Sequence, residues 1–167
     1  VSGFTVNEDE PVADVTGADL TGTGEVLINE IARGPSPGAD WVELVVVADG
    51  LDLHGYEVRD AAGNAMVLDG DGLAALPAGA VVVAAGPDAG LPAADDGFRV
   101  VVPASGGPLD LPEDGGRLQV HRPAGEAVFG VRWGSAAPAL DGLGVGLDAT
   151  LPAGGGLGLT GAAPDAA

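Results

Sequence analysis

Residues 26–31 read Val-Leu-Ile-Asn-Glu-Ile, and residues 40–44 read Asp-Trp-Val-Glu-Leu. Between them, residues 34–38 read Gly-Pro-Ser-Pro-Gly, a composition typical of a turn. The pattern therefore predicts two apolar β-strands joined by a turn. Each strand contains one glutamate, Glu30 or Glu43, in a setting where a buried strand would ordinarily avoid a charge.

Short apolar segments separated by Gly, Pro and Asp recur along the chain. Several of them alternate as half-buried strands do; Leu118 and Val120, for example, alternate with Gln119 and His121. Strands are expected over 26–31, 41–47, 56–59, 65–68, 80–84, 98–102, 117–122 and 128–133. Because no segment has a convincing apolar period of 3.6 residues, the sequence predicts an all-β fold, an antiparallel β-sandwich of about seven to nine strands.

Composition divides the chain into three parts. Residues 1–24 are acidic and rich in turn formers, which predicts a linker or arm with a possible edge strand at 3–6. Residues 25–148 are expected to form the sandwich. Residues 149–167 are rich in Gly, Ala and Pro, which predicts a C-terminal tail or a last edge strand near 157–159. No apolar run approaches the roughly 20 residues of a membrane-spanning helix, so no membrane insertion by this segment is expected.

The charge balance is strongly acidic. The chain has 25 Asp and Glu residues, six arginines and no lysine, which gives a formal net charge of -19. Nucleic-acid binding through a basic patch is therefore not expected. The acidity has three explanations that the sequence leaves open, namely a solvated surface, adaptation to high salt, and calcium binding. There is no cysteine, which excludes disulfides, thiolate zinc sites and cysteine catalysis.

Five motifs in order carry a family resemblance. They are INEI at 28–31, WVEL at 41–44, LHGYEV at 53–58, LPAGAVVV at 76–83, and the segments 116–120, 125–128 and 131–134 taken together. In this order they resemble the lamin-tail domain, a small immunoglobulin-like β-sandwich also found on bacterial and archaeal surface and secreted proteins. The chain departs from that pattern at Val45-Val46-Val47, where the family usually has an asparagine, and at His54, where a serine is common.

The resemblance implies an immunoglobulin-like fold and a set of structural motif residues, which are Asn29, Glu30, Trp41, Glu43, Gly55 and Tyr56. It also implies an extracytoplasmic, non-catalytic attachment or interaction module of a larger secreted or surface protein, with a protein or cell-surface partner. Recognition would use a loop cluster at one end of the sandwich or an exposed edge strand. Three arginines near the closing hairpin, Arg117, Arg122 and Arg132, could contact an acidic ligand or be solvated surface charges.

The glutamates Glu30 and Glu43 have two interpretations. In the structural one, their carboxylates accept hydrogen bonds from loop N–H groups and hold the turn between the strands. In the catalytic one they are paired acids of a glycoside-cleaving site, which would also need a cleft and aromatic platforms. The chain has only two tryptophans and one tyrosine, and His54 and His121 have no metal-ligand spacing. No catalytic residue and no enzymatic activity are therefore expected.

The best candidate for a bound ion is calcium at Asp69-Gly70-Asp71-Gly72. Asp69 and Asp71 could converge on one hard cation, but no twelve-residue loop with a closing glutamate is present. The same four residues also suit an ordinary hairpin turn, since Asp-Gly is a favoured turn dipeptide. No other cofactor is expected. The alternative functions are a calcium-dependent adhesion or carbohydrate-binding module and an accessory domain with hydrolase activity.

Overall fold

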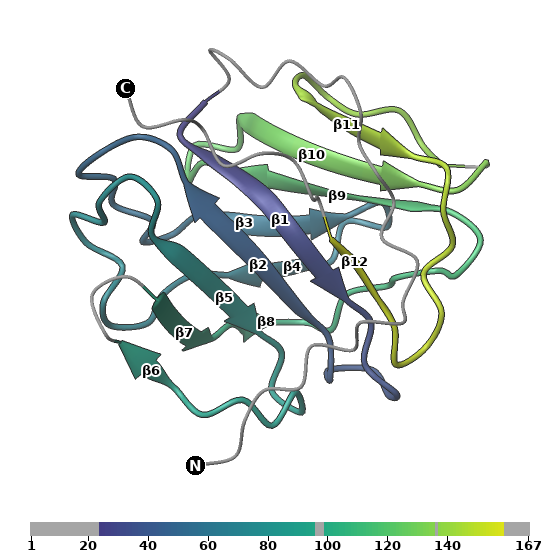
Figure 1. Cartoon of the computed structure of the whole chain (residues 1–167), viewed down its shortest axis with the longest axis horizontal. Helices are drawn as coiled ribbons and strands as arrows, with labels where there is room; N and C mark the ends of the chain where they lie inside the picture. Colours follow the sequence, from purple (N-terminus) through teal and green to yellow (C-terminus); the bar gives the residue numbers. More distant parts are fainter. Residues whose placement is uncertain (1–23, 96–98, 136, 159–167) are drawn as a thin grey trace.

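A computed structural model describes residues 24–95, 99–135 and 137–158 (Figure 1). Over these residues the chain forms twelve β-strands and no helix. The strands are β1 (Val26–Ala32), β2 (Trp41–Val46), β3 (Glu57–Asp60), β4 (Ala65–Val67), β5 (Val81–Ala85), β6 (Ala94–Asp95), β7 (Arg99–Pro103), β8 (Ser105–Gly106), β9 (Gly116–His121), β10 (Ala127–Trp133), β11 (Gly144–Leu147) and β12 (Gly156–Gly158). The arm expected over 1–24, apart from Gly24, and its possible edge strand at 3–6 lie outside the described residues.

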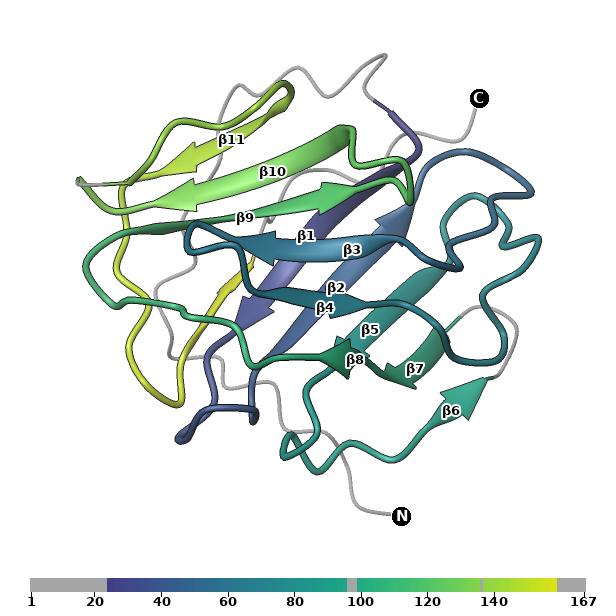
Figure 2. The same ribbon diagram turned by 180° about the vertical axis from the view of Figure 1, so that it is seen from behind.

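The strands form two six-stranded sheets. The first sheet has the order β12-β1-β2-β5-β7-β6, and the second has the order β11-β10-β9-β3-β4-β8. Figure 2 shows the second sheet in front, with the strands of the first sheet crossing behind it. The expected all-β, sandwich-like class is confirmed. No helix long and apolar enough to cross a membrane occurs in the part of the chain that the structure describes.

The architecture differs from the expected one in strand number and direction. The described chain has twelve strands instead of seven to nine, because β6, β8, β11 and β12 are short pieces in segments with weak strand patterns. Both sheets are mixed, since β7 runs parallel to β5 and β11 runs parallel to β10. Parallel neighbours need a longer connection than a hairpin turn, and residues 86–98 and 134–143 supply it.

A β-bulge in β1 sets which residues face the core. Ile28 lies opposite Leu44 and Glu30 lies opposite Glu43, so Asn29 is an extra residue without a partner on β2. Without this insertion, strict alternation would place Ile31 on the face opposite to Ile28. With it, Ile28 and Ile31 are both buried, while Glu30 lies on the outer face.

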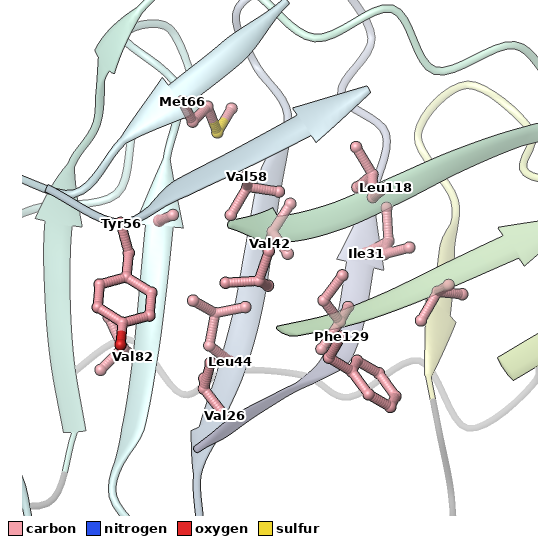
Figure 3. Close-up of a cluster of buried hydrophobic side chains, with 14 of the residues drawn as sticks. Val26, Ile31, Val42, Leu44, Tyr56, Val58, Met66, Val82, Leu118 and Phe129 are labelled. Carbon is pink, nitrogen blue, oxygen red and sulfur yellow. The ribbon is translucent and has the colours of Figure 1, made fainter. Parts of the chain in front are cut away.

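The core lies between the sheets and consists mainly of aliphatic side chains. Figure 3 shows Val42 and Leu44 of β2 facing Val58, Leu118 and Phe129 from the second sheet. Trp133 is fully buried, and its indole N–H donates a hydrogen bond of 2.8 Å to the carbonyl of Pro112. Phe129 and Trp133 therefore fill the interior with large aromatic side chains.

The segment after residue 148 belongs to the first sheet as far as it is described. β12 pairs with β1, so that Leu157 lies opposite Ile31. Leu151 is fully buried, and its N–H donates to the carbonyl of Glu113 at 3.0 Å. The last edge strand that was expected near 157–159 is thus present as β12 over the residues described.

Candidate interaction edge at β11

The two motif glutamates lie side by side on the outer face of the first sheet. Asn29, the bulged residue, donates its side-chain amide to Glu43 Oε1 at 2.7 Å. The pKa of Glu30 is raised, mainly by partial burial and further by the negative charge of Glu43. A Cβ atom at Gly156 would lie 3.3 Å from Glu30 Oε1, so the glycine of β12 leaves room for this carboxylate.

The loop between β1 and β2 is held by a different carboxylate from the expected ones. The N–H of Gly34 donates to Asp40 Oδ1 at 2.8 Å, and Asp40 is 4% exposed. Burial raises the pKa of Asp40, against the lowering effects of this hydrogen bond and of Arg33. Asp40 and not Glu30 or Glu43 thus accepts the N–H group of Gly34, because Asp40 lies next to the turn and the two glutamates lie on the strands.

Tyr56 and Glu25 connect the two sheets. The Tyr56 hydroxyl donates to Glu25 Oε2 at 2.6 Å, and Arg122 contacts both oxygens of the same carboxylate at 2.6 and 3.1 Å. Arg122 also forms an ion pair with Glu126. Arg122 lowers the pKa of Glu25, while burial and then Glu25 raise the pKa of Tyr56 to about 12. This cluster fastens the start of β1 to the end of β9.

Gly55 and Trp41 have structural positions as well. Gly55 has a φ of 75°, in the left-handed region where a side chain would be strained, and its N–H donates to the carbonyl of Leu68 at 2.7 Å. Trp41 begins β2 on the outer face and lies in register between Ala32 and Ala85. Four of the six motif residues thus lie on the β1–β2 hairpin of the first sheet, and Gly55 and Tyr56 lie directly before β3 of the second sheet.

The two aspartates considered for calcium lie in the loop after β4. Asp69 accepts a hydrogen bond of 2.7 Å from the hydroxyl of Ser105. The turn at Gly72 lies close to Asp95, since a Cβ atom at Gly72 would be 2.7 Å from Asp95 Oδ2. Within residues 24–95, 99–135 and 137–158, no three His, Asp or Glu side chains gather in a way that could hold a metal ion.

The outer face of the second sheet carries three arginines. Arg59 pairs with Glu57 at 2.5 Å, and Arg117 lies 3.4 Å from Asp141. Arg132 lies opposite Arg117 in the ladder and is exposed. In the described part of the chain, the Arg132 side chain forms no hydrogen bond or ion pair.

β11 is the edge strand beside Arg132. Gly134 N donates to the Leu147 carbonyl at 3.0 Å, so the peptide groups of Leu147 point toward β10. Because successive residues of a strand point their peptide groups to opposite sides, those of Gly144 and Gly146 point away from β10. Among the described residues, no strand pairs with that side of β11.

The surface around this edge is open, and Arg132 is the one cation among the described residues that line the hollow there. Gly144 and Gly146 are exposed, and as glycines they place no side chain on the outer face. A hollow of about 280 Å³ lies at the end of β11, lined by Arg132, Gly134, Ser135, Gly146, Leu147 and Asp148. Leu143, directly before the strand, is 49% exposed. The arrangement can accept an added strand and can present a guanidinium group beside it.

Sequence reasoning did not predict β11, although a signal for it was present. Leu143, Val145 and Leu147 alternate with glycines, which is a period of two, but glycine is depleted in strands, so the signal is weak. Comparison of the chain with family models, curated proteins and solved structures finds no match.

Proposed function

We propose that this chain is a non-catalytic attachment module of the lamin-tail type, within a larger secreted or surface protein. It binds an extended segment of a partner protein by adding that segment as a strand beside β11. The observation that carries this proposal is the outer side of β11, with which no other strand of the described residues pairs and to which strand alternation directs the peptide groups of Gly144 and Gly146. The sequence motifs and the two-sheet fold support the family assignment.

β11 is better suited to this role than the other sheet edges. It has four residues, whereas β12 has three and β6 and β8 have two each. Exposed edges are usually protected by lysine, proline or an inward charge, and residues 144–147 contain none of these. The peptide groups of Gly144 and Gly146 offer main-chain hydrogen bonds that do not depend on the partner's sequence.

The alternative functions have less support in the described structure. A sugar-binding face would expose a row of aromatic rings. Among the described residues Trp133, Phe129 and Tyr56 are buried, which leaves Trp41 as the single aromatic ring on an outer face. A hydrolytic site would gather carboxylates in a cleft, and the hollow beside β11 has one carboxylate, Asp148. No observation on the described residues favours either alternative over strand addition.

The test is a selection of extended, strand-forming peptides against the protein, followed by binding to the variant Gly146→Pro. Proline removes the outward N–H of Gly146 and keeps the side of the strand that pairs with β10, since proline is tolerated on edges. Because a Cβ atom at this position would also lie 3.0 Å from Arg132 Nε, Gly146→Ala, which makes the same contact and keeps the N–H, is measured beside it. A matched control is Gly107→Pro, next to β8 at the opposite edge of the same sheet, where a Cβ atom would meet nothing within 4 Å.

Selected peptides should lose binding to Gly146→Pro and keep it with Gly107→Pro. In amide hydrogen exchange, the bound peptide should protect Gly144 and Gly146. Peptides that bind both variants equally, without protection of these two amides, would rule out β11 as the site.

A further inference from the structure

We infer that the segment bound at β11 is acidic and presents a carboxylate to Arg132. This inference rests on the proposed function and specifies the chemistry of the partner. It depends on the position of Arg132 relative to the free edge, on the pairing of the other arginines, and on the glycines of β11.

Arg132 extends over β11 toward the free edge. It lies opposite Gly146 in the ladder, and a Cβ atom at Gly146 would lie 3.0 Å from Arg132 Nε and 3.5 Å from Nη2. The arginine side chain therefore occupies the space that a side chain at position 146 would fill. An added strand lies about 4.8 Å further out. Its outer-face residue opposite Gly146 is then within reach of the guanidinium group.

Four other arginines already have carboxylate partners within the described residues. They are Arg33 with Glu113 at 3.8 Å, Arg59 with Glu57 at 2.5 Å, Arg117 with Asp141 at 3.4 Å, and Arg122 with Glu25 at 2.6 Å. Arg132 forms no ion pair within that part of the chain, although the chain has 25 acidic residues. Asp148 lines the hollow at the end of β11 together with Arg132 but forms no ion pair with that arginine.

A carboxylate is the group that best complements this position. Guanidinium binds carboxylate through two parallel N–H···O bonds, which require a fixed approach. An arriving strand fixes that approach, because its main chain is held by Gly144 and Gly146. A lysine or arginine at the same place on the added strand would face Arg132 directly and be disfavoured.

The test uses three fluorescent peptides that differ only at the centre of a Thr-Val-Xaa-Val-Thr segment, where Xaa is Glu, Gln or Lys. Fluorescence anisotropy measures their binding to the whole chain and to the variants Arg132→Gln, Gly146→Pro and Arg59→Gln. Arg59→Gln is the matched control, because it removes the same charge from the same sheet face at a residue that is already paired.

The Glu peptide should bind about tenfold more tightly than the Gln peptide, since a charged pair is stronger than a neutral hydrogen bond. Arg132→Gln should abolish this preference, Arg59→Gln should retain it, and Gly146→Pro should weaken all three peptides. Equal binding of Glu and Gln peptides, still lost with Gly146→Pro, would overturn the acidic partner and leave strand addition standing.

Two other results would overturn more than the acidic character of the partner. If none of the three peptides binds and the selection against the protein also yields no binder, both the acidic partner and strand addition fail. If sedimentation shows a dimer that Gly146→Pro converts to monomer, the edge is occupied by a second copy of this chain, and the assignment to a separate acidic segment is wrong.

Discussion

At the residue scale, Glu30 and Glu43 form a like-charged pair across two strands. The pKa of Glu30 is raised above its usual 4.5 by burial and by Glu43. The folded state therefore binds more protons than the unfolded state in the window above pH 4.5, and the free energy of unfolding rises as the pH falls through it. Glu30→Gln should raise the free energy of unfolding by about 0.5 kcal/mol at neutral pH, and this gain should vanish well below pH 4.5.

Urea denaturation of the wild type and of Glu30→Gln at several pH values measures this effect. Asp71→Asn, which changes an exposed loop carboxylate, is the control and should give no gain. A Glu30→Gln variant that is less stable than the wild type at every pH would mean that the Glu30 carboxylate is stabilised by a partner.

Tyr56 is the only tyrosine of the chain, so its titration can be assigned without ambiguity. Its pKa is raised from 10.0 to about 12 by burial and by Glu25. The folded state holds the phenol proton longer than the unfolded state, so stability is full below pH 10.0 and falls as the pH rises toward 12. Tyr56→Phe should cost about 1–2 kcal/mol at neutral pH through loss of the bond to Glu25.

The measurement is chemical denaturation from neutral to alkaline pH, with ultraviolet absorbance following the phenol. The decline of stability above pH 10.0 should be smaller in Tyr56→Phe than in the wild type. Titration of the phenol near 10 in the folded wild type would contradict the contact with Glu25.

At the element scale, the segment that leads into β12 is part of the folded body. Leu151 is fully buried, and Arg33 donates to its carbonyl at 3.1 Å. Leu151→Ala should therefore lower the free energy of unfolding by about 2–5 kcal/mol, as for other buried leucines. Leu143→Ala, at a leucine that is 49% exposed, is the matched control and should change stability by less than about 0.5 kcal/mol. Similar losses in both variants would place Leu151 outside the cooperative core.

At the scale of the whole molecule, the net charge of -19 opposes the compact state. Sodium chloride should raise the melting temperature, because the Debye length falls to about 3 Å at 1 M and repulsion among the acidic residues is screened. Calcium should add no more than sodium at matched ionic strength, since residues 24–95, 99–135 and 137–158 hold no cluster of three metal-binding side chains. Thermal unfolding in both salts, with and without chelator, measures these changes in melting temperature.

A rise in melting temperature that is specific to calcium and reversed by chelator would show a calcium site. The described residues would then supply only part of its ligands. Asp69→Asn and Asp71→Asn would then identify whether the loop after β4 takes part. Absence of any stabilisation by sodium chloride would show that charge repulsion contributes little to the stability of this domain.

Much of the first sheet follows from local pattern. Val26, Ile28, Val42 and Leu44 alternate with polar or outer-face positions, so β1 and β2 were predictable to within a residue or two. β11 and β12 were harder to predict from the sequence, because their outward positions are glycines and a strand without polar alternation has a weak signal. The partner of the loop N–H group, Asp40, was missed because the choice between three nearby carboxylates depends on backbone direction.

The sequence by itself determined the all-β class, most of the long strands, the acidic surface and the aromatic-poor aliphatic core, because these follow from composition and from a two-residue period. Only the tertiary structure decided that β7 and β11 join their neighbours in parallel, that Glu25 meets Arg122 across the two sheets, and that Arg132 lies over Gly146 beside an open edge. These contacts join residues far apart in the chain, and their formation depends on how the sheets pair and pack, which no local pattern encodes.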